Sequence, residues 1–283
     1  MIEFEMPKLP PTPDPEPCPT HGVVPELHSE CQQCLQDLRE ATRQYNADRE
    51  TWRRWEGATV PPRLQGKTLQ TWKPRTPADR QAMALLQGYV ADLQTNVKTG
   101  RGVLLMGGPG LGKSHLLAAL IGDAVEAGLE AGFIAWPELI TRHREAQQGD
   151  RTHRDRTLLQ TAMDMGVLAL DEIGLAPMTE WQLAELFRLV DSRYSRLQPT
   201  LLAGNVNPAT LGKAIGERTA DRLLESCVCV PLTGASRRPD APQRPEPPRF
   251  SEPQPVTMNV WLGHRWSERK IEAERFSHGR REL

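Results

Sequence analysis

The sequence predicts an α/β fold in which a parallel sheet carries helices on both faces. Short apolar runs alternate with helical patterns, as βαβ units require. A Gly-rich loop joins one of these runs, residues 103–106, to a helical pattern over 115–128. A second apolar run, 167–170, ends in the acidic pair Asp171-Glu172. Loops that follow the strands of a parallel sheet meet at one edge, so these two features are expected to form a single site.

Composition limits the classes of function. The chain has 283 residues with 35 Lys and Arg against 36 Asp and Glu, so its total charge indicates no partner. It contains no apolar run of ~18 residues and no secretory signal pattern, and we expect a cytoplasmic protein without a membrane span. Five cysteines in a reducing compartment favour metal binding over disulfides.

The N-terminal part predicts an arm followed by a metal site. Residues 1–19 contain seven prolines, which oppose regular structure, and 1–17 are expected to be a disordered arm. A C-x2-H-x9-C-x2-C array follows, and such knuckles direct thiolate and imidazole ligands to a tetrahedral Zn²⁺. The expected ligands are Cys18, His21, Cys31 and Cys34, with His28 as an alternative fourth ligand. Cys227 and Cys229 lie two apart on a predicted strand and are expected to be small apolar residues.

A long polar helix is predicted over 35–56 and completes a zinc-binding module over 18–59. Its Trp52 and Trp55 fit either a strut or a surface that docks a partner protein. Gly57 and Pro61-Pro62 then mark a domain boundary near residue 60. A helix over 78–98 precedes the strand at 103–106.

The Gly-rich loop is a phosphate-binding P-loop, G-x-x-x-x-G-K-S, between a strand and a helix. Its glycines let successive amides point at phosphate oxygens, and the helix that follows adds its positive N-terminal end. We expect Lys113 to reach the β- and γ-phosphates and Ser114 to coordinate Mg²⁺. The loop residues are Gly107, Gly108, Pro109, Gly110, Leu111, Gly112, Lys113 and Ser114.

The remaining segments supply the rest of a phosphoryl-transfer site. Predicted strands cover 132–136, 167–170, 199–203 and 227–232. Predicted helices cover 137–148, 150–165 and two short stretches up to 225. A further helix is predicted to begin at Thr179, with Gln182 as the partner of this capping residue. Asp171 is expected to hold the Mg²⁺ shell and Glu172 to polarise the attacking water. Asn205 fits either a water-orienting amide or a turn residue. Arg218, Arg237 and Arg238 are candidates for neutralising transition-state charge, or surface ion-pair residues.

The order of these parts resembles the DnaC/DnaI/IstB group of AAA+ ATPases over residues 60–238. The resemblance lies in Val60 to Arg63, Gly107 to His115, Leu168 to Gly174, Arg193-Tyr194, Pro199 to Asn205, and Gly216 to Leu224. It implies an ATPase domain in which Gly107–His115 bind ATP and Asn205 is the sensor-1 residue. It also implies that Arg218 is donated in trans to a neighbouring subunit and that Arg238 is the sensor-2 residue. Ser236-Arg237-Arg238 replaces the family's Ser-Tyr-Arg, and Gly204 stands where the family has Ser, so the choice between Arg237 and Arg238 stays open.

The resemblance further implies a homo-oligomeric ring or spiral that loads the replicative DNA helicase onto single-stranded DNA. The zinc array followed by a long helix resembles the adaptor of such loaders, bacteriophage proteins included. Backbone contacts to DNA are expected from Arg142, Arg144, Arg151, Arg154 and Arg156, with Trp136 or Trp181 as a stacking surface. Two alternatives remain: an IstB-like helper of a transposase, and a nucleotide-gated scaffold without significant turnover.

The C-terminal segment 239–283 changes composition again. It contains seven prolines between Pro239 and Pro255 and then a charged stretch with Trp261 and Trp266. A mostly disordered tail is the expectation, with a short partner-binding helix around 267–276 as an alternative.

Overall fold

The structure, a computed structural model, describes residues 16–26, 30–148, 158–238, 246–262 and 265–271. The chain divides into two compact units. One unit combines Met1–Glu50 with Glu252–Leu283, and the other is Thr51–Ser251. The first and last parts of the chain therefore belong to the same unit, whereas the sequence predicted an N-terminal module and a separate tail. Each unit is described by itself below.

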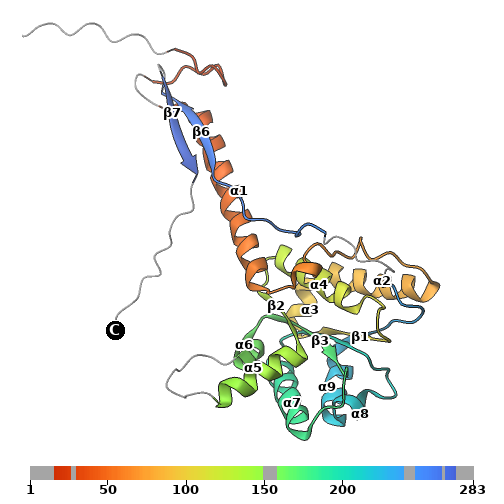
Figure 1. Ribbon diagram of the computed structural model, residues 1–283. Helices are drawn as coiled ribbons and strands as arrows, with labels where there is room; N and C mark the ends of the chain where they lie inside the picture. Colours follow the sequence, from red (N-terminus) through yellow and green to blue (C-terminus); the bar gives the residue numbers. More distant parts are fainter. Residues whose placement is uncertain (1–15, 27–29, 149–157, 239–245, 263–264, 272–283) are drawn as a thin grey trace, which may run out of the picture. The chain divides into compact units, whose positions relative to one another are not determined.

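A five-stranded parallel sheet forms the centre of the second unit, as predicted (Figure 1). The strands are β1 (Gly102–Met106), β2 (Ala131–Ala135), β3 (Val167–Ile173), β4 (Thr200–Gly204) and β5 (Cys227–Pro231). Their spatial order is β2-β3-β4-β1-β5. The strand that leads into the P-loop is therefore flanked by β4 and β5, and β4 separates it from the strand that carries the acidic pair.

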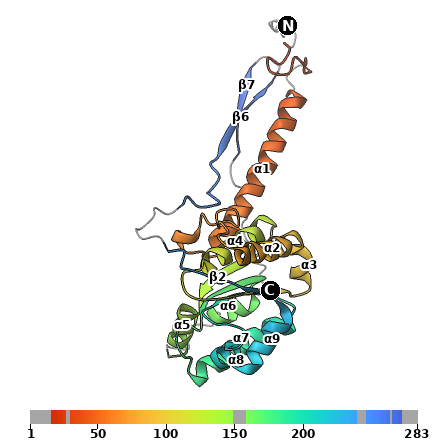
Figure 2. The same cartoon turned by 90° about the vertical axis from the view of Figure 1, so that its right-hand side faces the viewer.

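Helices cover both faces of this sheet (Figures 1 and 2). One face carries the 3₁₀ helix η1 (Pro62–Leu64) and the helices α2 (Pro77–Ala91), α3 (Leu93–Lys98) and α4 (Lys113–Glu126). The other carries α5 (Trp136–Gln148), α6 (Leu158–Asp164), α7 (Glu180–Ser195), α8 (Leu211–Ile215) and α9 (Glu217–Ser226). Alternate residues of β1 supply the two cores: Val103 and Leu105 pack on the first face, Leu104 and Met106 on the second.

Capping residues set two of the helix starts. The predicted capping box of α7 is confirmed, because the Thr179 hydroxyl accepts a hydrogen bond from the Gln182 amide at 3.3 Å and the Gln182 side chain accepts one from the Thr179 amide at 2.9 Å. Thr76 and Asp79 form the same motif at α2. The single helix predicted over 78–98 is wrong, since α2 ends at Ala91 and α3 begins at Leu93.

The first unit contains the start of the long helix α1 (Gln32–Gly57) and an antiparallel pair of strands, β6 (Val256–Trp261) and β7 (Trp266–Ile271). The expectation of a mostly disordered tail is wrong for these strands. The alternative, a short helix around 267–276, is wrong over Ser267–Ile271, which lie in β7, and the remainder of that range lies outside the described residues. Residues near Trp261 are ordered by contacts with segments more than 200 positions away, which no local pattern reveals.

Residues 246–250, near the end of the second unit, pack on α4 and on the end of α1. The Arg249 guanidinium pairs with Asp123 of α4 at 2.7 Å and with Glu126 at 2.5 Å. The Phe250 ring lies 5.2 Å from that of Trp55, which is 4% exposed. Trp55 is therefore a core residue and not part of an exposed docking surface.

Among the described helices, none is long and apolar enough to cross a membrane.

Candidate nucleotide site and metal site

Three strand ends bring the predicted nucleotide-binding residues together. The P-loop follows β1, Asp171 and Glu172 lie near the end of β3, and Asn205 follows β4. Because β4 lies between the other two strands, Asn205 is placed between the loop and the acidic pair. This is the edge of a parallel sheet at which ligands bind in α/β proteins.

The P-loop needs its glycines for two physical reasons. Gly107, Gly110 and Gly112 have φ values of 150°, 77° and 87°, a region that side chains with a Cβ rarely adopt. A Cβ on Gly107 would lie 2.3 Å from the Leu232 carbonyl oxygen, and one on Gly112 would lie 2.5 Å from Nε1 of Trp72. The loop then enters α4 at Lys113, so the free amides of the first helical turn face the phosphate side.

Lys113 connects the loop to β4. Its ammonium donates hydrogen bonds to the carbonyl oxygens of Gly107 at 2.9 Å and Gly108 at 2.7 Å, and to Oδ1 of Asn205 at 2.7 Å. The residue is 8% exposed, and burial lowers the pKa of the ammonium while the nearby Asp171 carboxylate opposes that shift. These bonds hold the charge between the P-loop and the end of β4.

The acidic pair divides into a buried and an exposed carboxylate. Asp171 is 7% exposed, whereas Glu172 is exposed. The pairing of β3 with β4 shifts register between Leu170 and Ile173, and Glu172 has a φ of 62°. Its amide donates a hydrogen bond to Oδ1 of Asp171 at 2.9 Å. A positive φ at a residue other than Gly costs ~1–3 kcal/mol and is characteristic of functional positions. Here it coincides with the register shift at which Glu172 is exposed.

Arg237 and Arg238, between which the sequence did not decide the sensor-2 residue, have different surroundings. The Arg237 guanidinium stacks 3.9 Å above the Trp72 ring and pairs with Asp79, and the Arg237 amide donates to the Gly110 carbonyl at 2.7 Å. Arg238 is exposed, and its charge contributes to the lowered pKa of Lys113. Arg237 therefore braces the P-loop from outside, while Arg238 remains available near the lysine.

The other predicted residues of the site are less tightly engaged. Ser114 is half-buried in the first turn of α4. His115 points to the linker before α2, where Nε2 lies 2.9 Å from the Thr68 carbonyl oxygen and 3.0 Å from the Thr71 hydroxyl. Arg218 is exposed in the first turn of α9, and within the described part of the chain no side chain pairs with it. Its position suits a contact with another molecule.

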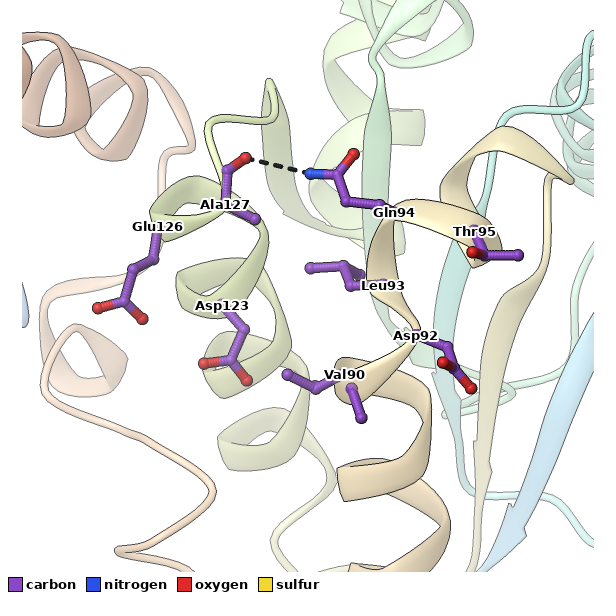
Figure 3. A pocket seen from close by; sticks show the side chains of 9 residues that line it. Val90, Asp92, Leu93, Gln94, Thr95, Asp123, Glu126 and Ala127 are labelled. Atoms are coloured by element: carbon purple, nitrogen blue, oxygen red, sulfur yellow. Dashed lines mark hydrogen bonds between the residues drawn. The ribbon is translucent and has the colours of Figure 1, made fainter.

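The polar groups of this site fit a nucleoside triphosphate with Mg²⁺. Loop amides and the Lys113 ammonium suit phosphate oxygens, while the Ser114 hydroxyl and the Asp171 carboxylate are oxygen ligands of the kind that Mg²⁺ prefers. A separate cavity of about 390 Å³ lies at the far end of α4, lined by α2, α3 and α4 (Figure 3). Its lining includes Asp92, Asp123 and Glu126, and the last two pair with Arg249.

Four ligand atoms in the first unit form a compact cluster. The Nδ1 atom of His21 lies 3.7, 3.8 and 3.5 Å from the sulfurs of Cys18, Cys31 and Cys34, and the sulfurs of Cys18 and Cys34 are 3.7 Å apart. Zinc bonds of about 2.3 Å to sulfur and 2.0 Å to nitrogen place tetrahedral ligands roughly 3.5–3.8 Å from one another. The cluster therefore fits a zinc ion, whereas the alternative ligand His28 lies outside the described residues.

Asp37 supports the histidine of this cluster. Its carboxylate accepts a hydrogen bond at 3.0 Å from Nε2 of His21, and the other ring nitrogen, Nδ1, is directed at the sulfurs. Histidines that bind metals commonly donate their second ring nitrogen to a carboxylate. The sequence analysis missed Asp37, although its spacing of three from Cys34 on a helix places the two side chains on one face. It also missed Trp72 and Asp79, for which no motif exists.

The predicted DNA contacts are brought together only in part. Arg142 pairs with Glu138 at 2.7 Å, and the Arg144 guanidinium lies 4.8 Å from the centre of the Trp181 ring. The His143 ring stacks on Trp181 as well, so the Trp181 indole, a predicted stacking surface for DNA, is in contact with both Arg144 and His143. Trp136 is 3% exposed and belongs to the core. Arg151, Arg154 and Arg156 lie outside the described residues.

Comparison with known proteins places the second unit in a family. Over 147 residues, the chain is 35% identical to the "Insertion sequence IS21 putative ATP-binding protein" of Pseudomonas aeruginosa, covering 50% of this chain and 54% of that protein. Over 164 residues it is 24% identical to the "Replicative helicase loader DnaC" of Escherichia coli (strain K12), covering 58% and 65%. The chain thus spans between half and two thirds of the length of these relatives.

The fold is that of AAA+ P-loop proteins. The crystal structure of the DnaC helicase loader superposes with a TM-score of 0.55 at 24% identity, covering 61% of this chain and all of that one. The profile of the family described as IstB-like ATP binding protein matches residues 57–243, which include the P-loop, the acidic pair, Asn205 and the three arginines. By this match the chain belongs to the family of IstB-like ATP binding proteins.

Proposed function

We propose that this protein is an ATP-hydrolysing loader of the replicative DNA helicase, which delivers that enzyme onto single-stranded DNA. The observation that supports it most is the buried Lys113 ammonium held between the P-loop and Asn205, beside an acidic pair with one free carboxylate. The relationship to a protein named as a replicative helicase loader supports the choice of partner. The zinc-fitting cluster, which lies outside the family match, supports a separate adaptor.

Within the nucleotide site, each residue has a proposed task. The loop Gly107–Gly112 and the Lys113 ammonium bind the phosphates of ATP, and Ser114 and Asp171 hold Mg²⁺, which neutralises charge on the phosphate oxygens. Glu172, exposed beyond Asp171, accepts a proton from the attacking water. Asn205 orients that water, and its bond to Lys113 couples the two positions.

Two arginines complete the proposed site. Arg238 acts on the nucleotide of its own subunit, because Arg237 is committed to Trp72 and Asp79. Arg218, exposed on α9, reaches the nucleotide of the next subunit in a ring or spiral, so that hydrolysis requires assembly. In that assembly, Arg142 and Arg144 line a path for single-stranded DNA through contacts with its phosphates.

Replacing Glu172 with Gln tests the ATPase part of the proposal. The amide keeps the shape of the side chain but cannot accept a proton, so we expect turnover to fall by ~10²–10⁴-fold while ATP and Mg²⁺ still bind. The measurements are phosphate release and equilibrium binding of a fluorescent ATP analogue, with Glu180→Gln, an exposed acid at the start of α7, as the matched control. Unchanged turnover in the Glu172 variant would remove this residue as the base. Absence of turnover in the wild type with DNA and helicase present would favour the scaffold function.

A second candidate is an ATPase helper of a transposase. The 35% identity to the IS21 ATP-binding protein favours it, since that relative is more similar in sequence than the DnaC loader. Affinity capture with the purified chain distinguishes the two candidates. We expect the replicative helicase of the same genome to be retained in the presence of ATP and Mg²⁺. Retention of a transposase, together with a preference for duplex over single-stranded DNA, would establish the helper instead.

A further inference from the structure

We infer that the C-terminal hairpin is the second half of the zinc module, and that Trp261 is the residue that positions the cysteine ligands. The inference rests on the proposed zinc site and concerns how residues from both ends of the chain build it. The β6–β7 pair lies alongside the first part of α1 in both views of the molecule (Figures 1 and 2). Because the hairpin lies beyond residue 243, the family match does not include it.

The backbone of Trp261 contacts two of the four ligand residues directly. Its carbonyl oxygen accepts a hydrogen bond from the Cys31 amide at 2.7 Å, and its own amide donates one to the Cys34 sulfur. The first bond fixes the knuckle that begins at Cys31. The second places a donor on a sulfur that would bind zinc as a thiolate, and such bonds orient metal ligands and stabilise their charge.

Side chains of the hairpin close the cluster against water. Val260 is fully buried and Trp261 is 7% exposed, and both pack with Cys18, Cys31 and Cys34 in one apolar cluster. Nε1 of Trp261 also donates a hydrogen bond at 3.2 Å to the Glu16 carbonyl, which ties the hairpin to the chain just before Cys18. Water that reaches a zinc–thiolate bond promotes ligand exchange, so this cover is expected to slow zinc release.

An ion pair adds a contact between the two chain segments. Arg269 of β7 pairs with Glu30, the residue before Cys31. Neither partner belongs to the cluster of ligands, so the pair can be reversed without altering the donor set. This pair therefore offers a test of the contact itself.

Neither half has a sufficient core alone. An isolated two-stranded hairpin is marginal in water, and the segment 16–34 offers few apolar side chains besides its cysteines. The cluster of cysteines, Val260 and Trp261 joins them, so each half is expected to fold only with the other. The segment that binds nucleotide is thus inserted, in chain order, between the two halves of the zinc module.

Zinc release from the full-length protein tests the inference. Trp261→Ala keeps the backbone bonds but removes the indole that covers the cysteines and its hydrogen bond to Glu16. We expect its release of zinc to a chromogenic chelator to be at least ~10-fold faster than from the wild type. The matched control is Val256→Ala, which removes a 45% exposed side chain from the other end of the same hairpin and should release zinc at the wild-type rate. Binding of an ATP analogue should be unchanged in both variants, because their second unit is intact.

Charge reversal separates a specific contact from general damage. Arg269→Glu alone should accelerate zinc release, and Arg269→Glu combined with Glu30→Arg should restore the wild-type rate. In hydrogen exchange, chelation of zinc should remove protection from amides of 256–261 and 266–271 but not from those of β1 and β4.

The outcomes distinguish this inference from the zinc proposal beneath it. A wild-type protein without stoichiometric zinc overturns both. A wild type that holds zinc, with Trp261→Ala releasing it equally slowly or with hairpin amides unaffected by chelation, overturns the inference and leaves the zinc module in place.

Discussion

At the scale of single residues, Arg237 and Arg238 are adjacent in sequence but differ in their contacts. Arg237→Ala removes the stack on Trp72 and the partner of buried Asp79, and we expect a loss of about 2 kcal/mol of unfolding free energy. Arg238→Ala removes an exposed side chain, and we expect an unchanged melting temperature with a turnover loss of ~10²-fold. Thermal melts and ATPase rates of the two variants check this assignment. An exchange of the two phenotypes would make Arg237 the sensor residue.

Asp79 gives the second unit a dependence on pH. Its burial raises the pKa of the carboxyl, but hydrogen bonds from the Arg75 amide, Arg237 and the Thr76 amide outweigh burial, and the pKa falls below its ordinary value. A depressed pKa stabilises the fold above the unfolded-state value of about 3.9, and this contribution is lost as the pH falls through the folded-state pKa. Asp79→Asn should therefore cost about 1–2 kcal/mol at pH 7 and progressively less below about pH 4. Denaturant titrations of both proteins over this pH range measure the difference, and a constant difference would contradict it.

At the scale of elements, Arg193 joins α7 to α6 and β4. The side chain is fully buried and donates hydrogen bonds to four carbonyl oxygens: those of Ala162 in α6, Met165 directly after α6, Gly166 before β3 and Pro199 before β4. Burial lowers its pKa to about 9, so the guanidinium keeps its proton at neutral pH. These bonds satisfy carbonyls at a helix end and at two strand starts, which would otherwise be buried without donors.

Substitution of Arg193 tests this arrangement. Arg193→Met keeps most of the apolar volume but leaves the carbonyls without donors, and we expect a loss of about 3 kcal/mol or more. Arg196→Ala, at an arginine on the surface that pairs with Asp164, should cost less than about 1 kcal/mol. Chemical denaturation of both variants gives the comparison. Similar small losses would mean that water replaces the Arg193 donors.

At the scale of the whole molecule, the proposed donation of Arg218 predicts complementation between inactive subunits. Arg218→Ala and Lys113→Ala should each reduce turnover by ~10³-fold or more, because one lacks the donated charge and the other lacks a competent loop. In a mixture, the Lys113 variant supplies Arg218 to the intact loop of the Arg218 variant. We expect turnover at least ~10-fold above that of either variant alone. No gain on mixing, with assembly verified by light scattering, would place the arginine's action within its own subunit.

The sequence by itself determined the local chemistry of this protein. The P-loop, the acidic pair and the Thr179 cap depend on residues close together in the chain, and the backbone of each is fixed by its own glycines, strand or capping partner. The cysteine–histidine array could likewise be predicted from the sequence, because the spacing of the ligands within two tight turns sets its geometry. The alternation of strands and helices likewise gave the parallel sheet.

Only the tertiary structure decided how distant segments are combined. The stack of Arg237 on Trp72, the burial of Trp55 under Phe250, and the contact of Trp261 with Cys31 each join residues more than 150 positions apart. Such contacts have no periodicity or spacing in the sequence, since their energy comes from burial and from hydrogen bonds that exist only after the chain has folded. The other end of the chain supplies the core of the hairpin. For this reason the sequence predicted a charged tail at these residues.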